Sequence, residues 1–233
     1  GAPGAAPLVS VWARIGDTLR RLATGEPLLA LLGRLRSPPE RTVAFAIATV
    51  ALGAKIAKAD GQVTRDEVAA FREVFLIPPG EERSAARVYN LARQDTAGFE
   101  AYAAQVKRLF GAGAPQLADL LEGLFHVALA DGDYHDEEDG FLHRVAQLFE
   151  LPEREFRRIR AVFVPDAQRD PREVLGLPPG ATREEASAAW RALVRDTHPD
   201  RLLARGLPEE AIRLAEKRLI AVNDAWGRIQ AEG

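Results

Sequence analysis

Cysteine is absent from the 233 residues of the sequence. Disulfides, thiolate metal sites and a thiol nucleophile are therefore excluded, and the composition suits the cytosol, where we expect the protein to be located. An excess of one charge is also absent, since 31 Lys and Arg residues face 34 Asp and Glu residues for a formal net charge of −3. Nucleic-acid binding requires a concentrated basic surface, and this balance gives no reason to expect it.

Long hydrophobic runs are missing as well. The longest apolar run covers residues 42–54 and is bounded by Arg41 and Lys55. A helix that spans a bilayer takes about 20 apolar residues, so we expect no transmembrane segment and interpret this run as a core helix. Residues 1–7 lack the basic start of a secretory signal.

Signals that begin and end helices occupy most of the remaining sequence. In a capping box, a Ser or Thr and a Glu three residues later bond free N–H groups of the first turn, and such boxes begin at Ser37, Thr64 and Thr182. Glycine and proline turns separate the helical patterns, and no convincing strand is present. The predicted helices cover residues 11–22, 28–35, 38–59, 64–76, 84–94, 96–110, 116–130, 136–149, 152–163, 183–197 and a segment from residue 208 onward. The predicted fold class is all-α.

The first 36 residues contain a short amphipathic pattern. Trp12, Ile15, Leu19 and Leu22 recur at helical spacing with arginines between them. The pattern predicts a helix that packs on the rest of the protein, and the alternative is a helix that lies on a membrane surface.

An internal repeat organises the centre of the chain. The residues ADG, followed after four residues by two acidic residues, occur at 59–67 and again at 130–138. Each copy follows a hydrophobic helix and begins a charged one, so two such units facing each other predict a pseudosymmetric helical bundle. Residues 38–163 resemble the TerB (tellurite-resistance) domain in this pattern. We assign residues 1–36 to an N-terminal amphipathic segment, 37–163 to a TerB-like bundle and 164–170 to a linker.

The second copy lies in an acidic segment without Lys or Arg between Arg108 and Arg144. One interpretation is that Asp-Gly makes a turn and the following carboxylates favour a helix N-terminus. The other is a divalent-cation site, because metal binding has been suggested for TerB-like domains and carboxylate oxygens suit a hard cation. The candidate ligands are Asp60, Glu67, Asp131, Asp133 and Glu138. The segment is not an EF-hand loop, since Asp136 stands where the required glycine would be and Leu142 where the final glutamate would be.

The C-terminal part is organised around His198-Pro199-Asp200. A capped helix runs from Thr182 toward this tripeptide, and Pro199 disfavours the helical conformation of His198. Pro208, followed by two glutamates, is suited to be the first residue of a second helix. Apolar stripes run along both helices, at Ala186, Trp190, Leu193 and Thr197, and at Ile212, Ala215, Leu219, Val222, Trp226 and Ile229. The two helices should pack antiparallel to bury these stripes, which leaves the tripeptide exposed at the tip of a hairpin.

These residues carry a family resemblance. The Val-Leu-Gly-Leu stretch at 174–177, the capped helix, the tripeptide and the Asn-Asp-Ala-Trp stretch at 223–226 resemble a J domain of the DnaJ class. We assign residues 171–233 to this J domain. A TerB domain followed by a J domain is the arrangement of the DjlA family, which usually begins with a membrane-spanning segment. The resemblance implies docking on a DnaK-type heat-shock chaperone and stimulation of its ATPase, for which the tripeptide is essential.

The family usually carries a dense basic face on the helix before the tripeptide, and here that face is thin. The predicted docking residues are His198, Pro199, Asp200, Arg191, Arg195 and Arg201. An exposed His and Asp separated by proline, with no nucleophile, do not make a catalytic pair. We therefore expect no enzyme activity from this chain.

The sequence thus predicts a co-chaperone that recruits a DnaK-type chaperone, while its TerB-like part localises it or binds client proteins. No cofactor is expected apart from the possible divalent cation. One alternative is a cation- or stress-sensing module whose J-like hairpin is a structural appendage. Another is a peripheral membrane adaptor held by the helix of Trp12.

Overall fold

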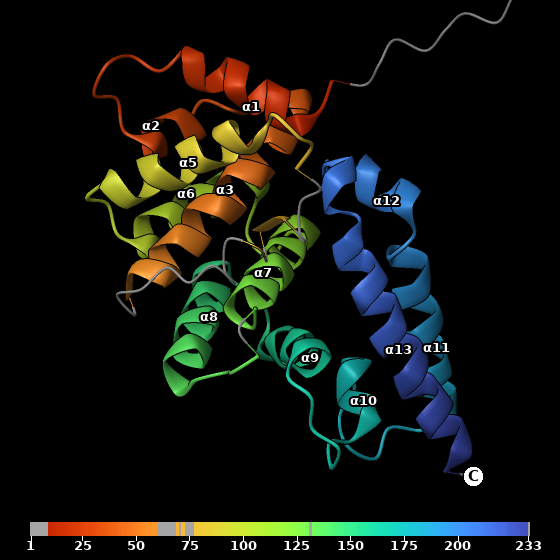
Figure 1. Cartoon of the computed structure of the whole chain (residues 1–233). Coiled ribbons are helices and arrows are strands. Elements are labelled where there is room, and N and C mark those ends of the chain that lie inside the picture. Colours follow the sequence, from red (N-terminus) through yellow and green to blue (C-terminus); the bar gives the residue numbers. More distant parts are fainter. Residues whose placement is uncertain (1–8, 60–68, 70, 73–76, 131, 233) are drawn as a thin grey trace, which may run out of the picture.

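The structure is a computed structural model that describes residues 9–59, 69, 71–72, 77–130 and 132–232. All regular elements of these residues are helices, which confirms the all-α prediction. Helices α1 to α3 and α5 to α9 form one part, which we call the main bundle (Figure 1). Helices α10 to α13 form the C-terminal hairpin, which packs along one side of it.

The N-terminal helices α1 (Val11–Arg20) and α2 (Leu28–Leu32) cover one end of the main bundle. The N–H of Ala13 donates to the Ser10 side chain, which caps α1. Trp12, Ile15 and Leu19 are fully buried, and α1 packs on α3 and α5. The packing interpretation of this helix is therefore confirmed, and its apolar face is not available to a membrane.

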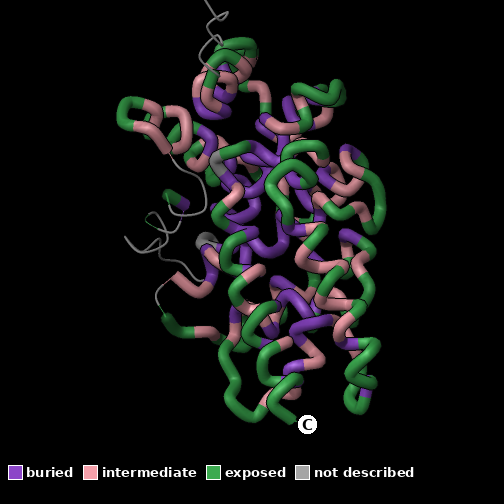
Figure 2. The backbone as a smooth tube through the Cα atoms, turned by 90° about the vertical axis from the view of Figure 1, so that its right-hand side faces the viewer, coloured by how far each residue is buried: buried purple, intermediate pink, exposed green. Residues whose placement is uncertain are grey.

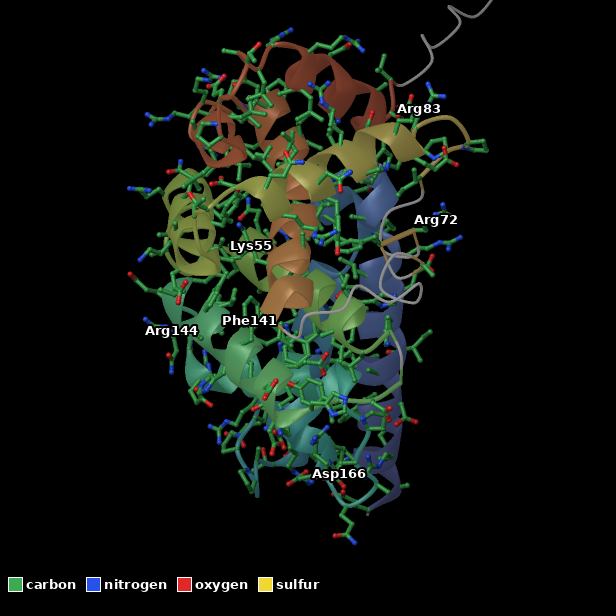
Figure 3. The ribbon with its side chains drawn as sticks, turned by 60° about the vertical axis from the view of Figure 1, so that its left-hand side comes forward. Lys55, Arg72, Arg83, Phe141, Arg144 and Asp166 are labelled. Carbon is green, nitrogen blue, oxygen red and sulfur yellow. The ribbon has the colours of Figure 1, made fainter. Side chains whose placement is uncertain are left out.

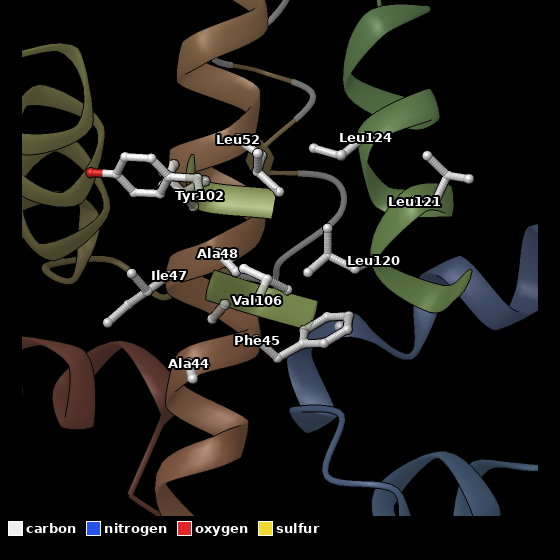
Figure 4. Packing of buried hydrophobic residues seen from close by; sticks show 14 of the residues in the cluster. Ala44, Phe45, Ile47, Ala48, Leu52, Tyr102, Val106, Leu120, Leu121 and Leu124 are labelled. Atoms are coloured by element: carbon white, nitrogen blue, oxygen red, sulfur yellow. The ribbon is translucent and has the colours of Figure 1, made fainter. Parts of the chain in front are cut away.

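Helix α3 (Pro38–Ala59) runs through the middle of the main bundle, between α5 (Glu82–Gln94), α6 (Phe99–Phe110) and α7 (Pro115–Ala128). Figure 4 shows Phe45 and Leu52 of α3 on the side that faces Leu120 and Leu124 of α7, whereas Ile47 lies on the opposite side of α3. Burying each such side chain contributes about 1.5–3 kcal/mol. Gly53 lets the ring of Phe71 lie against the α3 backbone, because an added Cβ would come within 2.3 Å of that ring.

Helix α3 also carries a buried cation, Lys55. Figure 3 shows Lys55 within the main bundle, whereas Arg83 and Arg144 lie on its periphery. The ammonium group of Lys55 donates to the carbonyl of Asp95 at 2.7 Å. It also lies 5.3 Å from the centre of the Tyr102 ring. The buried positive charge of Lys55 is therefore stabilised by a hydrogen bond and by an aromatic ring.

Helices α8 (Asp136–Leu148) and α9 (Glu153–Phe163) complete the main bundle. The ring of Phe125 from α7 stacks on Tyr134 and Phe163 and also contacts Phe156. These contacts hold α7, α9 and the turn before α8 together. The corresponding helix of the first repeat copy, predicted at 64–76, falls almost entirely outside the described residues.

The C-terminal hairpin consists of α10 (Pro171–Val174), α11 (Arg183–Asp196), α12 (Pro199–Ala204), the 3-10 helix η1 (Glu209–Ala211) and α13 (Arg213–Ala231). Its own hydrophobic cluster consists of Val174, Leu175, Ala186, Val222, Ala225 and Ile229, joined by Ala161 of α9. Gly176 turns the chain after α10 with a φ of 73°, which explains the glycine between two leucines. Figure 2 shows buried residues along the interior of the molecule and exposed residues along its outside.

Two details of the predicted hairpin are wrong. Pro208 does not begin the long helix, because η1 follows it and α13 begins only at Arg213. The stretch after the tripeptide, for which no helix was predicted, forms the short helix α12. Tertiary packing explains both differences. Leu202 and Leu207 are buried in the hydrophobic cluster of the main bundle, and this burial favours an ordered backbone around them.

The segment between the two parts is bonded to both of them. The guanidinium of Arg169 donates to the carbonyls of Ala161 and Val164, at 3.2 and 2.5 Å. Arg228 of α13 donates to the Arg169 carbonyl at 3.1 Å. Residues 164–170 are thus tied to α9 and α13, while the domain boundaries placed here stay a prediction.

Candidate functional site

Three hydrogen bonds fix the two ends of α11, the helix that leads to the tip of the C-terminal hairpin. Its capping box is confirmed: the N–H of Glu185 donates to Thr182 Oγ1 at 3.2 Å, and the N–H of Thr182 donates to the Glu185 carboxylate at 2.7 Å. At the other end, the Thr197 hydroxyl donates to the carbonyl of Leu193 at 2.6 Å. The helix therefore ends at a fixed position directly before the tripeptide.

The tripeptide His198-Pro199-Asp200 begins α12. His198 has extended backbone angles, with φ −61° and ψ 133°, and Pro199 occupies the first helical position. The N–H of Asp200 donates to His198 Nδ1 at 3.3 Å, so the imidazole caps the short helix. The side chains of His198 and Asp200 are nevertheless 62% and 87% exposed. The expected exposure at the hairpin tip is confirmed, and the tripeptide is bonded rather than loose.

The predicted basic residues lie beside this tip. Arg191 and Arg195 are exposed and one turn apart on α11. Arg191 donates to the Ser187 hydroxyl at 2.9 Å, and neither arginine pairs with a carboxylate of the described chain. Arg201 differs, because its guanidinium lies 2.7 Å from the Asp196 carboxylate. The free cationic charge of this face therefore comes from Arg191 and Arg195.

Two tryptophans fix the hairpin helices against each other. The rings of Trp190 on α11 and Trp226 on α13 stack with centres 5.6 Å apart and an angle of 16° between their planes. Trp190 Nε1 also donates to the Asn223 side chain at 2.8 Å. The bond and the stack set the register in which α11 holds its basic residues.

The opposite side of the hairpin is covered by the main bundle. Leu202, Leu207 and Leu214 belong to the hydrophobic cluster of the main bundle. Leu193 and Asp196 line a crevice of about 280 Å³ that faces α9 and the start of α7. Leu193 and Asp196 lie on a different face of α11 from Arg191 and Arg195. The packing thus leaves the tripeptide and the basic face open to a partner.

Sequence reasoning missed a group of buried charges behind the tip. Asp119 and Glu122 of α7, which belong to the acidic segment, are 2% and 0% exposed. They are paired with Arg218 of α13, with Arg205 after α12 and with Arg158 of α9. The spacing of three residues between the two carboxylates was the only local sign, since it places both on one helix face.

Two of the five predicted cation ligands, Asp133 and Glu138, lie among the described residues. Asp60, Glu67 and Asp131 lie outside the described residues. Asp133 is exposed, and the Glu138 carboxylate accepts the N–H of His135 at 3.0 Å. Among the described residues, no group of three or more His, Cys, Asp or Glu side chains is arranged to hold a metal ion. The cation site stays a prediction.

One acidic residue of this segment has a structural role. The hydroxyl of Tyr134 donates to Asp139 at 2.7 Å, and Arg160 lies 3.0 Å from the same carboxylate. Burial and the bond to Asp139 raise the pKa of Tyr134 well above its usual value. Asp139 lies in the first turn of α8, where a negative charge is favourable. The helix-N-terminus interpretation therefore holds for this residue.

Comparison with known proteins finds a family match for the central region and relatives that align with most of the chain. Residues 46–161 match the family model of the tellurite resistance protein TerB. The chain is 28% identical over 219 residues to the co-chaperone protein DjlA of Photobacterium profundum, covering 83% of this chain and 79% of that protein. It is 27% identical to DjlA of Vibrio cholerae, with coverages of 93% and 87%, and 25% identical to DjlA of Coxiella burnetii, with coverages of 75% and 72%.

No solved structure matches the chain. Within the part of the chain that the structure describes, every helix is too short or too polar to cross a membrane.

Proposed function

The chain is of the DjlA-like type, and we propose that it is a co-chaperone whose C-terminal hairpin docks on a DnaK-type heat-shock chaperone and stimulates its ATP hydrolysis. The observation that supports this proposal is the exposed tripeptide, capped by its own histidine, at the tip of the hairpin. The main bundle, which contains the TerB domain, localises the protein or binds client proteins.

The chemistry of the tip suits recognition of a cationic partner group. The Asp200 carboxylate is exposed, and it can accept charge-assisted hydrogen bonds from an arginine of the partner. Because Pro199 and the His198 cap already fix the backbone, little conformational freedom is lost on binding. Arg191 and Arg195 add a positive face that suits an acidic surface on the chaperone.

The tip does not suit catalysis. The described residues around His198 and Asp200 offer no nucleophile placed against the imidazole. We therefore expect the ATP hydrolysis to be carried out by the partner, with this chain acting as its stimulator. The membrane-adaptor alternative loses its support because Trp12 is buried.

The test is a single-turnover ATPase assay with a bacterial DnaK-type chaperone. The parent protein should accelerate hydrolysis, and His198→Gln should abolish the acceleration while circular dichroism shows an unchanged fold. His135→Gln, the same change at an exposed histidine of the main bundle, is the matched control and should behave like the parent. A folded His198→Gln variant that stimulates as well as the parent would disprove the proposal.

A second variant distinguishes two roles of His198, the capping of α12 and direct contact with the chaperone. Asparagine is a favoured helix N-cap, so His198→Asn should keep α12 capped and still lose the imidazole. We expect it to be as inactive as His198→Gln. Restored stimulation by His198→Asn would mean that capping, rather than contact with the partner, is what the histidine contributes.

A further inference from the structure

Five buried or half-buried charges connect the main bundle to the C-terminal hairpin. We call this group the interdomain clamp: it consists of Asp119, Glu122, Arg158, Arg205 and Arg218. Arg218 Nε lies 2.9 and 3.0 Å from the two Glu122 oxygens, and its Nη2 lies 2.6 Å from Asp119. Arg205 Nη2 lies 2.9 Å from Asp119, and Arg158 Nη2 lies 3.3 Å from Glu122. Each carboxylate of α7 is thus shared by two arginines.

The geometry of the interdomain clamp admits one arrangement of the two parts. The guanidinium of Arg218 bonds both α7 carboxylates at once, and this planar fork fixes direction as well as distance. Burial by itself would lower the pKa of Arg218, but the negative charges of Glu122 and Asp119 raise it above its usual value. A shift of the hairpin that breaks these pairs while the charges stay buried would leave them without partners, which is strongly unfavourable.

The interdomain clamp reaches the tripeptide through α12. His198 caps the N-terminus of this short helix, and Arg205 is the residue at its C-terminal end. The Arg205 side chain bonds Asp119, and its carbonyl accepts the amide of Gln116 at 2.9 Å. Leu202, in the middle of α12, is buried in the hydrophobic cluster of the main bundle. The helix that carries the tripeptide is therefore held by the main bundle at its far end and along its inner face.

We propose that the main bundle positions the tripeptide through this clamp, and that Arg205 and Arg218 are positioning residues for docking of the chaperone. The inference rests on the proposed function, because it concerns the same docking site. A site that is already oriented loses less freedom when its partner binds. Loosening the interdomain clamp should therefore weaken docking even though no residue that touches the partner has changed.

The first experiment measures the arrangement without the chaperone. Because the chain has no cysteine, cysteines introduced at Ala188 on α11 and Gln147 on α8 are the only sites for spin labels. Electron–electron double resonance should give one narrow distance distribution for the parent. Arg205→Gln and Arg218→Met should broaden it, and Arg205→Lys should largely restore it. Arg213→Gln, a change at an exposed arginine of α13, is the matched control and should leave the distribution narrow.

The second experiment measures docking with unlabelled proteins. The readout is the concentration of this protein that gives half-maximal ATPase stimulation, at a temperature where every variant is fully folded by circular dichroism. Arg205→Gln should raise this concentration several-fold, Arg205→Lys should recover most of the loss, and Arg213→Gln should not change it. Arg205 is the more informative site because its side chain is 21% exposed, so the variant has the better prospect of folding.

The two readouts separate the possible failures. Unchanged distance distributions in Arg205→Gln and Arg218→Met would show that the charges do not hold the two parts together, which overturns the proposal. A broadened distribution with an unchanged half-maximal concentration would show that the hairpin acts independently of the main bundle, which also overturns it. If the parent itself gives no stimulation, the proposed function fails, and the positioning role fails with it.

Discussion

His198 serves the tripeptide in two ways at once. Its Nδ1 accepts the Asp200 N–H, so in this arrangement the proton of the neutral ring is on Nε2. The ring remains more than half exposed while it makes this bond. The residue that orders the backbone is thus also available to a partner, and the ordering costs nothing at the moment of binding.

The few free arginines of α11 lead to the first prediction. Exposed ion pairs contribute about 0.2–1 kcal/mol each, so docking through Arg191 and Arg195 should be weak and sensitive to salt. We expect Arg195→Ala to raise the half-maximal concentration for ATPase stimulation several-fold. An increase in salt from about 50 to 300 mM, which shortens the Debye length from more than 10 Å toward 5 Å, should do the same to the parent.

Arg183→Ala is the control for this prediction, because Arg183 is exposed on the same helix but at its other end. Twelve residues of α-helix separate it from Arg195, which is about 18 Å. If Arg195→Ala and salt both leave the half-maximal concentration unchanged, docking does not use this face.

At the scale of single residues, a side chain's surroundings could be predicted when its partners are close in the sequence and not when they are distant. His198 and the α11 arginines could be predicted because their surroundings are set by the local helix pattern. The partners of Glu122 could not, since Arg218 is 96 residues away in the chain. A carboxylate in an acidic run has the same local pattern whether it is solvated, bound to a cation or buried against arginine, and only the packing of α13 on α7 decides among these.

At the scale of elements, the capping box of α11 gives the second prediction. Replacing an N-cap Thr by Ala costs about 0.5–2 kcal/mol. We expect Thr182→Ala to lower the free energy of unfolding by about 1 kcal/mol, measured by urea denaturation. Thr96→Ala, at an exposed loop threonine whose side chain has no bond in the described structure, should change stability by less than about 0.5 kcal/mol. Equal losses in the two variants would rule out a capping contribution.

The acidic segment that begins α8 gives the third prediction, on divalent cations. Like charges crowded at Asp136, Glu137 and Glu138 repel one another, and a cation near the preceding turn would relieve this repulsion. We expect calorimetry to detect binding of Ca²⁺, Mg²⁺ or Zn²⁺ in the millimolar range. Ligand at 100 times its dissociation constant should add about 2.7 kcal/mol to the stability. Asp133→Asn should weaken the binding, and no heat together with no melting shift would exclude a cation site.

Element boundaries show where local signals stop being sufficient. The capped start of α11 was predicted correctly because both partners of the box lie within four residues. The start of α13 was predicted five residues too early at Pro208, although proline is a good first residue of a helix. Leu207 and Ala211 are buried in the main bundle, and their packing sets the path of the backbone there.

At the scale of the whole molecule, the packing leads to the fourth prediction. The cluster of the main bundle includes residues of α12 and α13, and the interdomain clamp adds buried charges across the same boundary. We therefore expect the main bundle and the C-terminal hairpin to unfold in one cooperative transition. Trp12 reports on the main bundle, and Trp190 and Trp226 report on the hairpin.

Tryptophan fluorescence of two variants provides the measurement. Trp12→Phe retains only the hairpin reporters, and the double variant Trp190→Phe/Trp226→Phe retains only the reporter of the main bundle. Each urea curve should coincide with the far-UV circular dichroism curve of the same variant. Two separate transitions in either variant would show that the hairpin and the main bundle fold as independent units.

The antiparallel hairpin also has a practical consequence for measuring the interaction. The tripeptide lies at one end of α13 and the C-terminus at the other (Figure 1), and the 19 residues of this helix span roughly 28 Å. A biotin or an affinity tag attached after the last residue therefore points away from the docking surface. Immobilisation through the C-terminus should leave the tip accessible on a sensor chip, whereas coupling through surface lysines would orient the molecules at random.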